Sequence, residues 1–200
     1  MFGLLQTLVG FQLGYVFCYT NQISPALNAK FGWTTKQEQD LYESIIGSSV
    51  TLTLMLGSYI AGHLIKKGRR NVLIYAGVIG ILGAAITIYQ QFWSIILGRL
   101  IYGLSCGFIA ISMPRTMEET IPNKWVGMFG GLYCLSFALA TMIAYFMAYF
   151  LPPDSDTVAL AESPVTQVIF GLPIVFYSLQ LLLQFTYFRM DPPKFLINID

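Results

Sequence analysis

Six long apolar stretches, separated by short polar or charged breaks, constrain this chain more than any other feature of its sequence. A helix needs about 20 apolar residues to cross the hydrocarbon core of a bilayer. Stretches of about that length are predicted at residues 3–27, 41–65, 72–90, 92–114, 125–151 and 165–188. The sequence therefore predicts an all-α, polytopic membrane protein in which residues 1–200 form a single bundle of six transmembrane helices.

The composition supports this prediction and argues against several functions. Hydrophobic residues make up 56% of the chain and charged residues only 10%, whereas soluble domains carry about 25% charged residues. The net charge of +1 gives no reason to expect a nucleic-acid partner. The sequence has no metal-ligand cluster, no Ser/His/Asp arrangement and no glycine-rich phosphate loop. We therefore expect neither an enzyme nor a bound cofactor or metal.

The basic residues predict how the helices are oriented. Short loops rich in lysine and arginine stay on the cytoplasmic side, or on the matrix side in an organelle. Eight of the eleven basic residues lie in the second and fourth breaks and in the tail, namely Lys66, Lys67, Arg69, Arg70, Arg115, Lys124, Arg189 and Lys194. Both termini are therefore predicted to face the cytoplasm or matrix. A plasma membrane, an endomembrane or an organelle inner membrane, mitochondrial included, all fit this pattern.

The fourth apolar stretch carries a charge and a series of glycines. Gly98, Gly103 and Gly107 are spaced so that a neighbouring helix can approach the backbone closely. Arg99 lies well inside the same stretch, where an arginine costs at least ~2.5 kcal/mol unless it finds a partner or water. Glu43, at the start of the second predicted helix, is an unmatched acid on the same side, and we expect it to pair with Arg99.

Four motifs in order resemble the sugar porters, the major facilitator group that includes facilitative glucose transporters and proton-linked sugar symporters. The run from Gly98 to Gly127, with Pro114, Glu119 and Pro122, is similar to the fourth helix and following loop of that family. The other three motifs are GFQLGYVFCYTNQISPAL, AGHLIKKGRRNVLI and MDPPKFLIN. The resemblance covers essentially the whole chain and implies the N-terminal six-helix half of such a transporter.

The resemblance also implies roles for particular residues. In sugar porters, loop charges on the inner face form a gating network that latches the outward-facing state. The corresponding residues here are Arg69, Arg70, Glu119, Asp191 and Lys194. Residues expected to line a solute pathway are Gln12, Asn21, Tyr133 and Cys134, although packing or interhelical hydrogen bonding is an equal alternative for the polar ones.

Several functional positions depart from the family pattern. Val16 stands where proton-linked members have the acid that pairs with Arg99, and Val126 replaces an expected arginine. Cys134 replaces the glutamine that binds sugar hydroxyls, and a thiol is a weaker hydrogen-bonding group than an amide. The acid expected in the second break is replaced by Ile65 or Lys66, depending on the alignment.

These departures favour a transporter-derived half recruited as a non-transporting accessory or structural subunit of a larger membrane complex. The alternative is the N-terminal half of a facilitative, not proton-coupled, carrier of a sugar or small polar solute that works by alternating access. Either function predicts contact with the lipid bilayer and with a second six-helix half or other membrane subunits, because a midplane site is shared between two halves.

Overall fold

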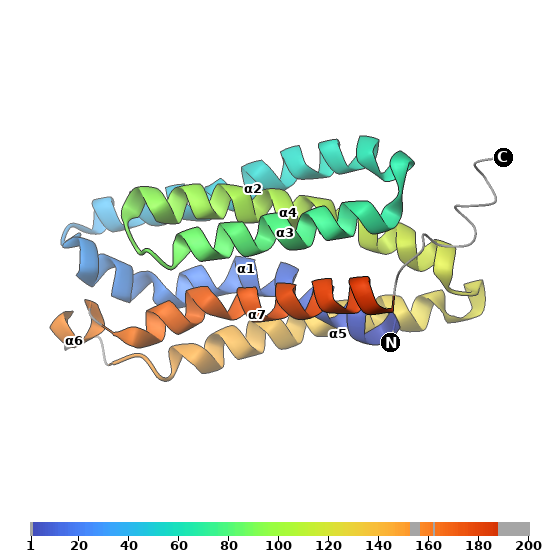
Figure 1. The fold of residues 1–200 in the computed structure, drawn as a ribbon. Helices are drawn as coiled ribbons and strands as arrows, with labels where there is room; N and C mark the ends of the chain where they lie inside the picture. Colours follow the sequence, from blue (N-terminus) through green and yellow to red (C-terminus); the bar gives the residue numbers. More distant parts are fainter. Residues whose placement is uncertain (1, 153–156, 162, 188–200) are drawn as a thin grey trace.

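The protein is a bundle of long helices (Figure 1). The computed structural model describes residues 2–152, 157–161 and 163–187 of the chain. The described elements are α1 (Phe2–Phe31), α2 (Lys36–Leu64), the 3-10 helix η1 (Ile65–Lys67), α3 (Arg69–Thr87), α4 (Phe92–Thr120), α5 (Asn123–Ala148), the short helix α6 (Thr157–Ala161) and α7 (Pro164–Thr186). Within these ranges there is no strand, and the predicted all-α fold with six long helices is confirmed.

Among the described residues, five helical segments are long and apolar enough to cross a membrane, judged by length and composition. They are Lys36–Lys67, Arg69–Thr87, Phe92–Thr120, Asn123–Ala148 and Val158–Thr186. The remaining long helix, α1, spans 30 residues but carries many amides and hydroxyls along its length. Its polar composition has a structural counterpart, because most of its side chains are buried against other helices and few face outward.

Helix α1 lies at the centre of the bundle. Figure 1 shows α2, α3 and α4 on one side of it and α5 and α7 on the other. The start of α1, the end of α7, η1 and the α4–α5 connection share one end of the bundle, which we call the basic end (Figure 1). The opposite end holds the α1–α2 and α3–α4 connections and α6. The side of the membrane that each end faces stays a prediction.

The predicted packing glycines lie where α4 meets two neighbours. A Cβ added at Gly103 would lie 2.5 Å from the Val50 carbonyl oxygen of α2, and one at Gly107 would lie 2.4 Å from the Leu54 carbonyl oxygen. At Gly98 the nearest backbone is that of α3, at 2.7 Å from the Gly83 carbonyl oxygen. The three glycines therefore let α4 serve as the common surface for α2 and α3.

Most helix boundaries differ from the prediction by a few residues, and the end of α4 and the fifth break differ in kind. Helix α4 continues through Pro114 to Thr120, because the residues after the proline resume helical bonding, with the Ile121 N–H donating to the Met117 carbonyl at 3.0 Å. The fifth predicted break, treated as a plain loop, contains α6. Ser163 then begins α7 by accepting from the Val165 N–H at 3.3 Å, ahead of a proline in the first turn.

Candidate functional site

The buried arginine is held by neutral groups. Arg99 is 2% exposed, and its Nε donates to the Ile46 carbonyl of α2 at 2.9 Å. Its Nη1 donates to the Thr20 hydroxyl of α1. The guanidinium carbon lies 5.4 Å from the centre of the Tyr19 ring, within cation–π range. We call these contacts of Ile46, Thr20 and Tyr19 the Arg99 cage; they tie α4 to both α1 and α2.

The predicted pairing of Arg99 with Glu43 is wrong in this structure. Glu43 accepts a hydrogen bond from the Ser24 hydroxyl and another from Asn28 Nδ2, the latter at 2.9 Å. Arg99 instead bonds the backbone of Ile46, one helical turn further along α2. Because polar groups of α1 form hydrogen bonds with the side chains of both Arg99 and Glu43, the two charges have no direct contact.

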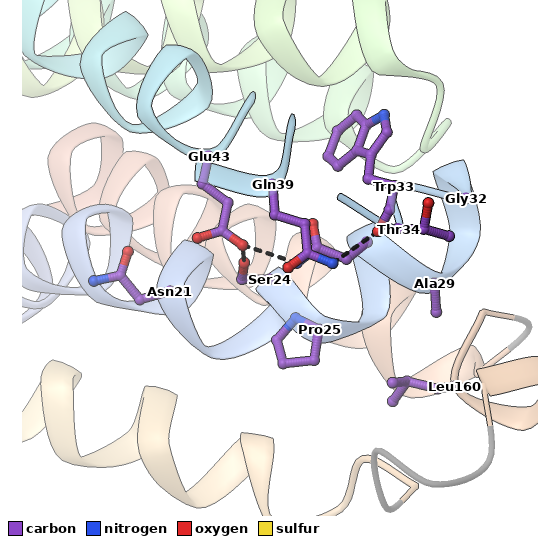
Figure 2. A pocket seen from close by; sticks show the side chains of 11 residues that line it. Asn21, Ser24, Pro25, Ala29, Gly32, Trp33, Thr34, Gln39, Glu43 and Leu160 are labelled. Carbon is purple, nitrogen blue, oxygen red and sulfur yellow. Dashed lines mark hydrogen bonds between the residues drawn. The ribbon is translucent and has the colours of Figure 1, made fainter. Parts of the chain in front are cut away.

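A polar pocket of about 710 Å³ opens around Glu43 at the end opposite the basic end (Figure 2). Helix α1 contributes Asn21, Ser24 and Asn28 to its lining, and α2 contributes Gln39 and Glu43. We call this space, with its full lining, the α1–α2 pocket; the other lining residues are Pro25, Ala29, Gly32, Trp33, Thr34 and Leu160.

The chain forms this pocket because α1 ends in a tight glycine turn. Gly32 has a φ of +69°, a conformation that glycine adopts without steric cost and that commonly terminates helices. The Trp33 N–H closes the turn on the Asn28 carbonyl at 3.0 Å, and Gln39 Nε2 donates to the Trp33 carbonyl at 2.7 Å. The turn thereby brings the first part of α2 against the last part of α1 (Figure 2).

A small cavity connects the α1–α2 pocket to the Arg99 cage. It has a volume of about 20 Å³ and shares Asn21, Ser24, Trp33 and Glu43 with the pocket. Its lining also includes Thr20 and Ile46, the two residues that accept hydrogen bonds from Arg99. A volume of that size can hold one water molecule. Polar groups therefore run continuously from the pocket to the groups that hold the buried guanidinium.

Two of the predicted gating residues meet at the basic end. Arg69 Nη2 lies 2.6 Å from Glu119 Oε1, and Arg69 Nε lies 3.1 and 3.0 Å from the two carboxylate oxygens. The two side chains are 13% and 19% exposed. This forked geometry fixes the orientation of a carboxylate more strictly than a single contact does, so the pair joins α3 to the last turns of α4.

The other predicted gating residues are not part of this pair. The Arg70 guanidinium carbon lies 5.8 Å from the centre of the Phe185 ring on α7. Asp191 and Lys194 lie outside the described residues. The structure therefore brings together Arg69 and Glu119 from the predicted network.

Of the four predicted solute-pathway residues, Asn21 lines the α1–α2 pocket, and the role of all four stays a prediction. Asn21 is exposed and lines the α1–α2 pocket, whereas Cys134 is exposed on α5, whose residues contribute nothing to that pocket's lining. Tyr133 is half-buried where α5 meets α1, with its backbone carbonyl close to Gly10. Gln12 is buried between helices, and neither polar atom of its side-chain amide has a partner.

Sequence reasoning missed the polar partners that α1 presents to α2 and α4. Thr20, Ser24 and Asn28 follow one another at intervals of four residues, so they share one helical face. This spacing in a helix otherwise read as apolar was a usable signal. In the structure the first bonds Arg99 and the other two bond Glu43.

These features define a class of protein: a polytopic helical membrane protein with a polar central helix and an arginine buried between its helices. A protein-family model described as "Sugar (and other) transporter" matches residues 2–198. The chain therefore belongs to this family of sugar and other transporters.

Characterised relatives are similar over nearly all of the chain. A Hexose transporter 1 of Plasmodium vivax (strain Brazil I) is 29% identical over 209 residues, which cover 99% of this chain and 42% of the relative. A Hexose transporter 1 of Plasmodium yoelii yoelii is 27% identical, covering 94% of this chain and 40% of the relative. The chain thus spans less than half the length of these relatives.

Solved structures share the fold. A crystal structure of a D-xylose-proton symporter superposes with a TM-score of 0.82 at 16% identity, covering 98% of this chain and 49% of the symporter. A proton:xylose symporter of the major facilitator superfamily, bound to 6-bromo-6-deoxy-D-glucose, gives a TM-score of 0.83 at 16% identity. The match covers 99% of this chain and 46% of the symporter. The protein has a major facilitator fold over about half of such a transporter, which confirms the expected family and fold.

Proposed function

We propose that this chain forms one six-helix half of a facilitative carrier for a neutral, hydroxyl-bearing solute such as a sugar. The observation that carries this proposal is the polar face of α1 at the pocket, where Ser24 and Asn28 bond the carboxylate of Glu43 and Asn21 is exposed beside them. Lipid cannot hydrogen-bond such groups, whereas water or a polyol can. Hexose transport by the relatives supports a solute of this class.

Facilitative transport follows from the surroundings of Arg99. Among the described residues no carboxylate lies within ion-pair distance of this guanidinium, and Val16 is fully buried one turn before Thr20 on α1. A proton carried by an acid paired with Arg99 would need a titratable partner there. The Arg99 cage supplies no carboxylate for this role, which supports a carrier that moves its solute down the solute's own gradient.

The test is uptake of radiolabelled D-glucose by liposomes that contain the carrier with both of its halves, purified from the native membrane. We expect saturable uptake that stops at equal concentrations on both sides and does not change when a proton gradient is imposed. The Asn21→Leu variant should lower the uptake rate, while Glu38→Gln, a change on α2 outside the pocket lining, should not. Accumulation above equilibrium driven by a proton gradient would refute facilitative transport.

A second function, the accessory membrane subunit, is compatible with the surface of α5. Its buried residues are Ser136, Ala140 and Ala144, which lie on one face of the helix, and most of the remainder is exposed and apolar. Such a surface can contact lipid or another membrane protein equally well. Purification in mild detergent distinguishes the two functions: a constant set of membrane-protein companions together with no solute uptake would favour the accessory subunit.

A further inference from the structure

The α1–α2 pocket combines the features of a small-molecule site. Its volume of about 710 Å³ falls within the range of roughly 300–1,000 Å³ typical of ligand pockets. It lies at the end of the bundle where α1 turns into α2, at the mouth of the path to the Arg99 cage. The residues of its lining therefore determine which kind of solute binds there.

Polar groups in the pocket have unused hydrogen-bonding capacity. The side-chain oxygen of Asn28 is buried and has no partner, although the amide nitrogen of the same side chain bonds Glu43. A buried polar atom without a partner is unusual in folded proteins and points to a missing water or ligand. Asn21 is exposed on the same face and offers both a donor and an acceptor.

Charge restricts the kind of ligand. Glu43 is the one acidic residue in the described lining, and no basic residue balances it there. A carboxylate accepts hydrogen bonds from hydroxyl groups strongly and repels an anion. The pocket therefore suits a neutral solute with several hydroxyl groups better than the corresponding acid.

The pocket also has an apolar side that fits the ring carbons of a sugar. Pro25 and Ala29 of α1 and Leu160 of α6 complete the lining (Figure 2). Figure 2 shows Gln39 and Glu43 reaching from α2 toward α1, with Pro25 of α1 and Leu160 of α6 lower in the view. A sugar has hydroxyl groups at its rim and C–H groups on its faces, which matches this division of the lining.

We propose that the α1–α2 pocket is an entry site that binds a neutral sugar on one half-bundle alone, with Glu43 selecting against sugar acids. This proposal rests on the proposed function for its solute class. The sugar hydroxyls would bond Glu43, the free oxygen of Asn28 and the amide of Asn21. Binding there precedes any passage deeper into the bundle.

The test uses the tryptophan at the pocket as its reporter. Trp33 lines the pocket, and the two other tryptophans, Trp93 and Trp125, are replaced by phenylalanine. We expect a saturable change in Trp33 fluorescence with D-glucose, and an apparent affinity for D-glucuronate at least about tenfold weaker, because like charges are costly in contact. Glu43→Gln should largely abolish this difference, whereas the control Glu38→Gln should retain it.

Three outcomes would overturn the proposal in monodisperse protein. They are no saturable signal with D-glucose, equal affinities for the neutral and acidic sugar, or an unchanged preference in Glu43→Gln. Liposome uptake separates this failure from failure of the carrier function. Uptake without a Trp33 signal would refute the entry site and support the carrier function. A selective Trp33 signal without uptake would support the entry site and refute the carrier function.

Discussion

Substitution of Gly103 by alanine tests whether close packing of α2 on α4 holds this bundle together. The new Cβ would lie 2.2 Å from the Thr53 hydroxyl oxygen, 2.5 Å from the Val50 carbonyl oxygen and 3.0 Å from the Val50 Cα. The threonine side chain can rotate, but the backbone of Val50 can move only if α2 moves. Overpacking a well-packed interface costs about 1–3 kcal/mol, and contact with backbone places this site in the upper part of that range.

The expected net effect is smaller than the packing cost. Alanine stabilises a helix by about 1 kcal/mol relative to glycine, so Gly103→Ala should lose about 1–2 kcal/mol in total. For a chain of 150–250 residues, each kcal/mol corresponds to roughly 2–4 °C in the unfolding midpoint. We therefore expect the midpoint in detergent to fall by about 2–8 °C.

The matched control lies on the facing helix. A Cβ at Gly47 of α2 meets no atom within 4 Å, so Gly47→Ala should gain helix propensity without a clash and keep or raise the midpoint. Both variants are followed by the temperature at which the monodisperse protein disappears from size-exclusion chromatography. A midpoint for Gly103→Ala equal to that of Gly47→Ala would refute close α2–α4 packing at this position.

Three further substitutions test the polar groups. In thermal unfolding, the Arg99→Met variant should be at least as stable as Arg99→Lys. Methionine leaves no carboxylate without a partner and removes the cost of burying a charge, which is at least ~2.5 kcal/mol. A more stable Arg99→Lys would show that the charge itself is needed. Glu119→Gln should cost about 1 kcal/mol and lose its effect when Arg69 is also replaced by alanine, as a double-mutant cycle would measure. Gln12→Leu should raise the unfolding midpoint, since leucine removes two buried polar atoms without partners at about 1–3 kcal/mol each, and a lower midpoint would indicate that an ordered water satisfies them.

Much of the fold could be predicted because a bilayer allows few alternatives. Long apolar stretches must form helices there, and charges and prolines mark the ends of those helices. The prediction ended the fourth helix at Pro114, yet α4 runs on to Thr120. A proline removes one backbone donor but does not prevent a helix from resuming after it, and composition alone does not reveal which outcome occurs.

The site was less predictable, because hydrogen bonding at α1 depends on how the helices pack. Arg99 and Glu43 were correctly recognised as unmatched charges, and the sequence offered each as a partner for the other. In the structure a backbone carbonyl and the Thr20 hydroxyl hold Arg99, while Ser24 and Asn28 hold Glu43. Every residue has a backbone carbonyl, so the sequence does not indicate which one accepts a hydrogen bond from Arg99. Small polar residues in a predicted span are equally compatible with many partners, so sequence could not choose among them.

Helix α4 links the two charged regions of the protein and limits how they can move. Arg99 and Glu119 lie twenty positions apart on this one helix, which at 1.5 Å per residue separates them by about 30 Å along its axis. Between them, Gly103 and Gly107 hold α2 in close backbone contact. Because both charges belong to α4, this one helix sets the distance between the Arg69–Glu119 ion pair and the Arg99 cage, and the close contacts leave little room for α2 to slide along it. Movement of α1 at the α1–α2 pocket would break the hydrogen bonds of Glu43 to Ser24 and Asn28 and the Arg99–Thr20 hydrogen bond, so the pocket and the Arg99 cage are coupled through α1.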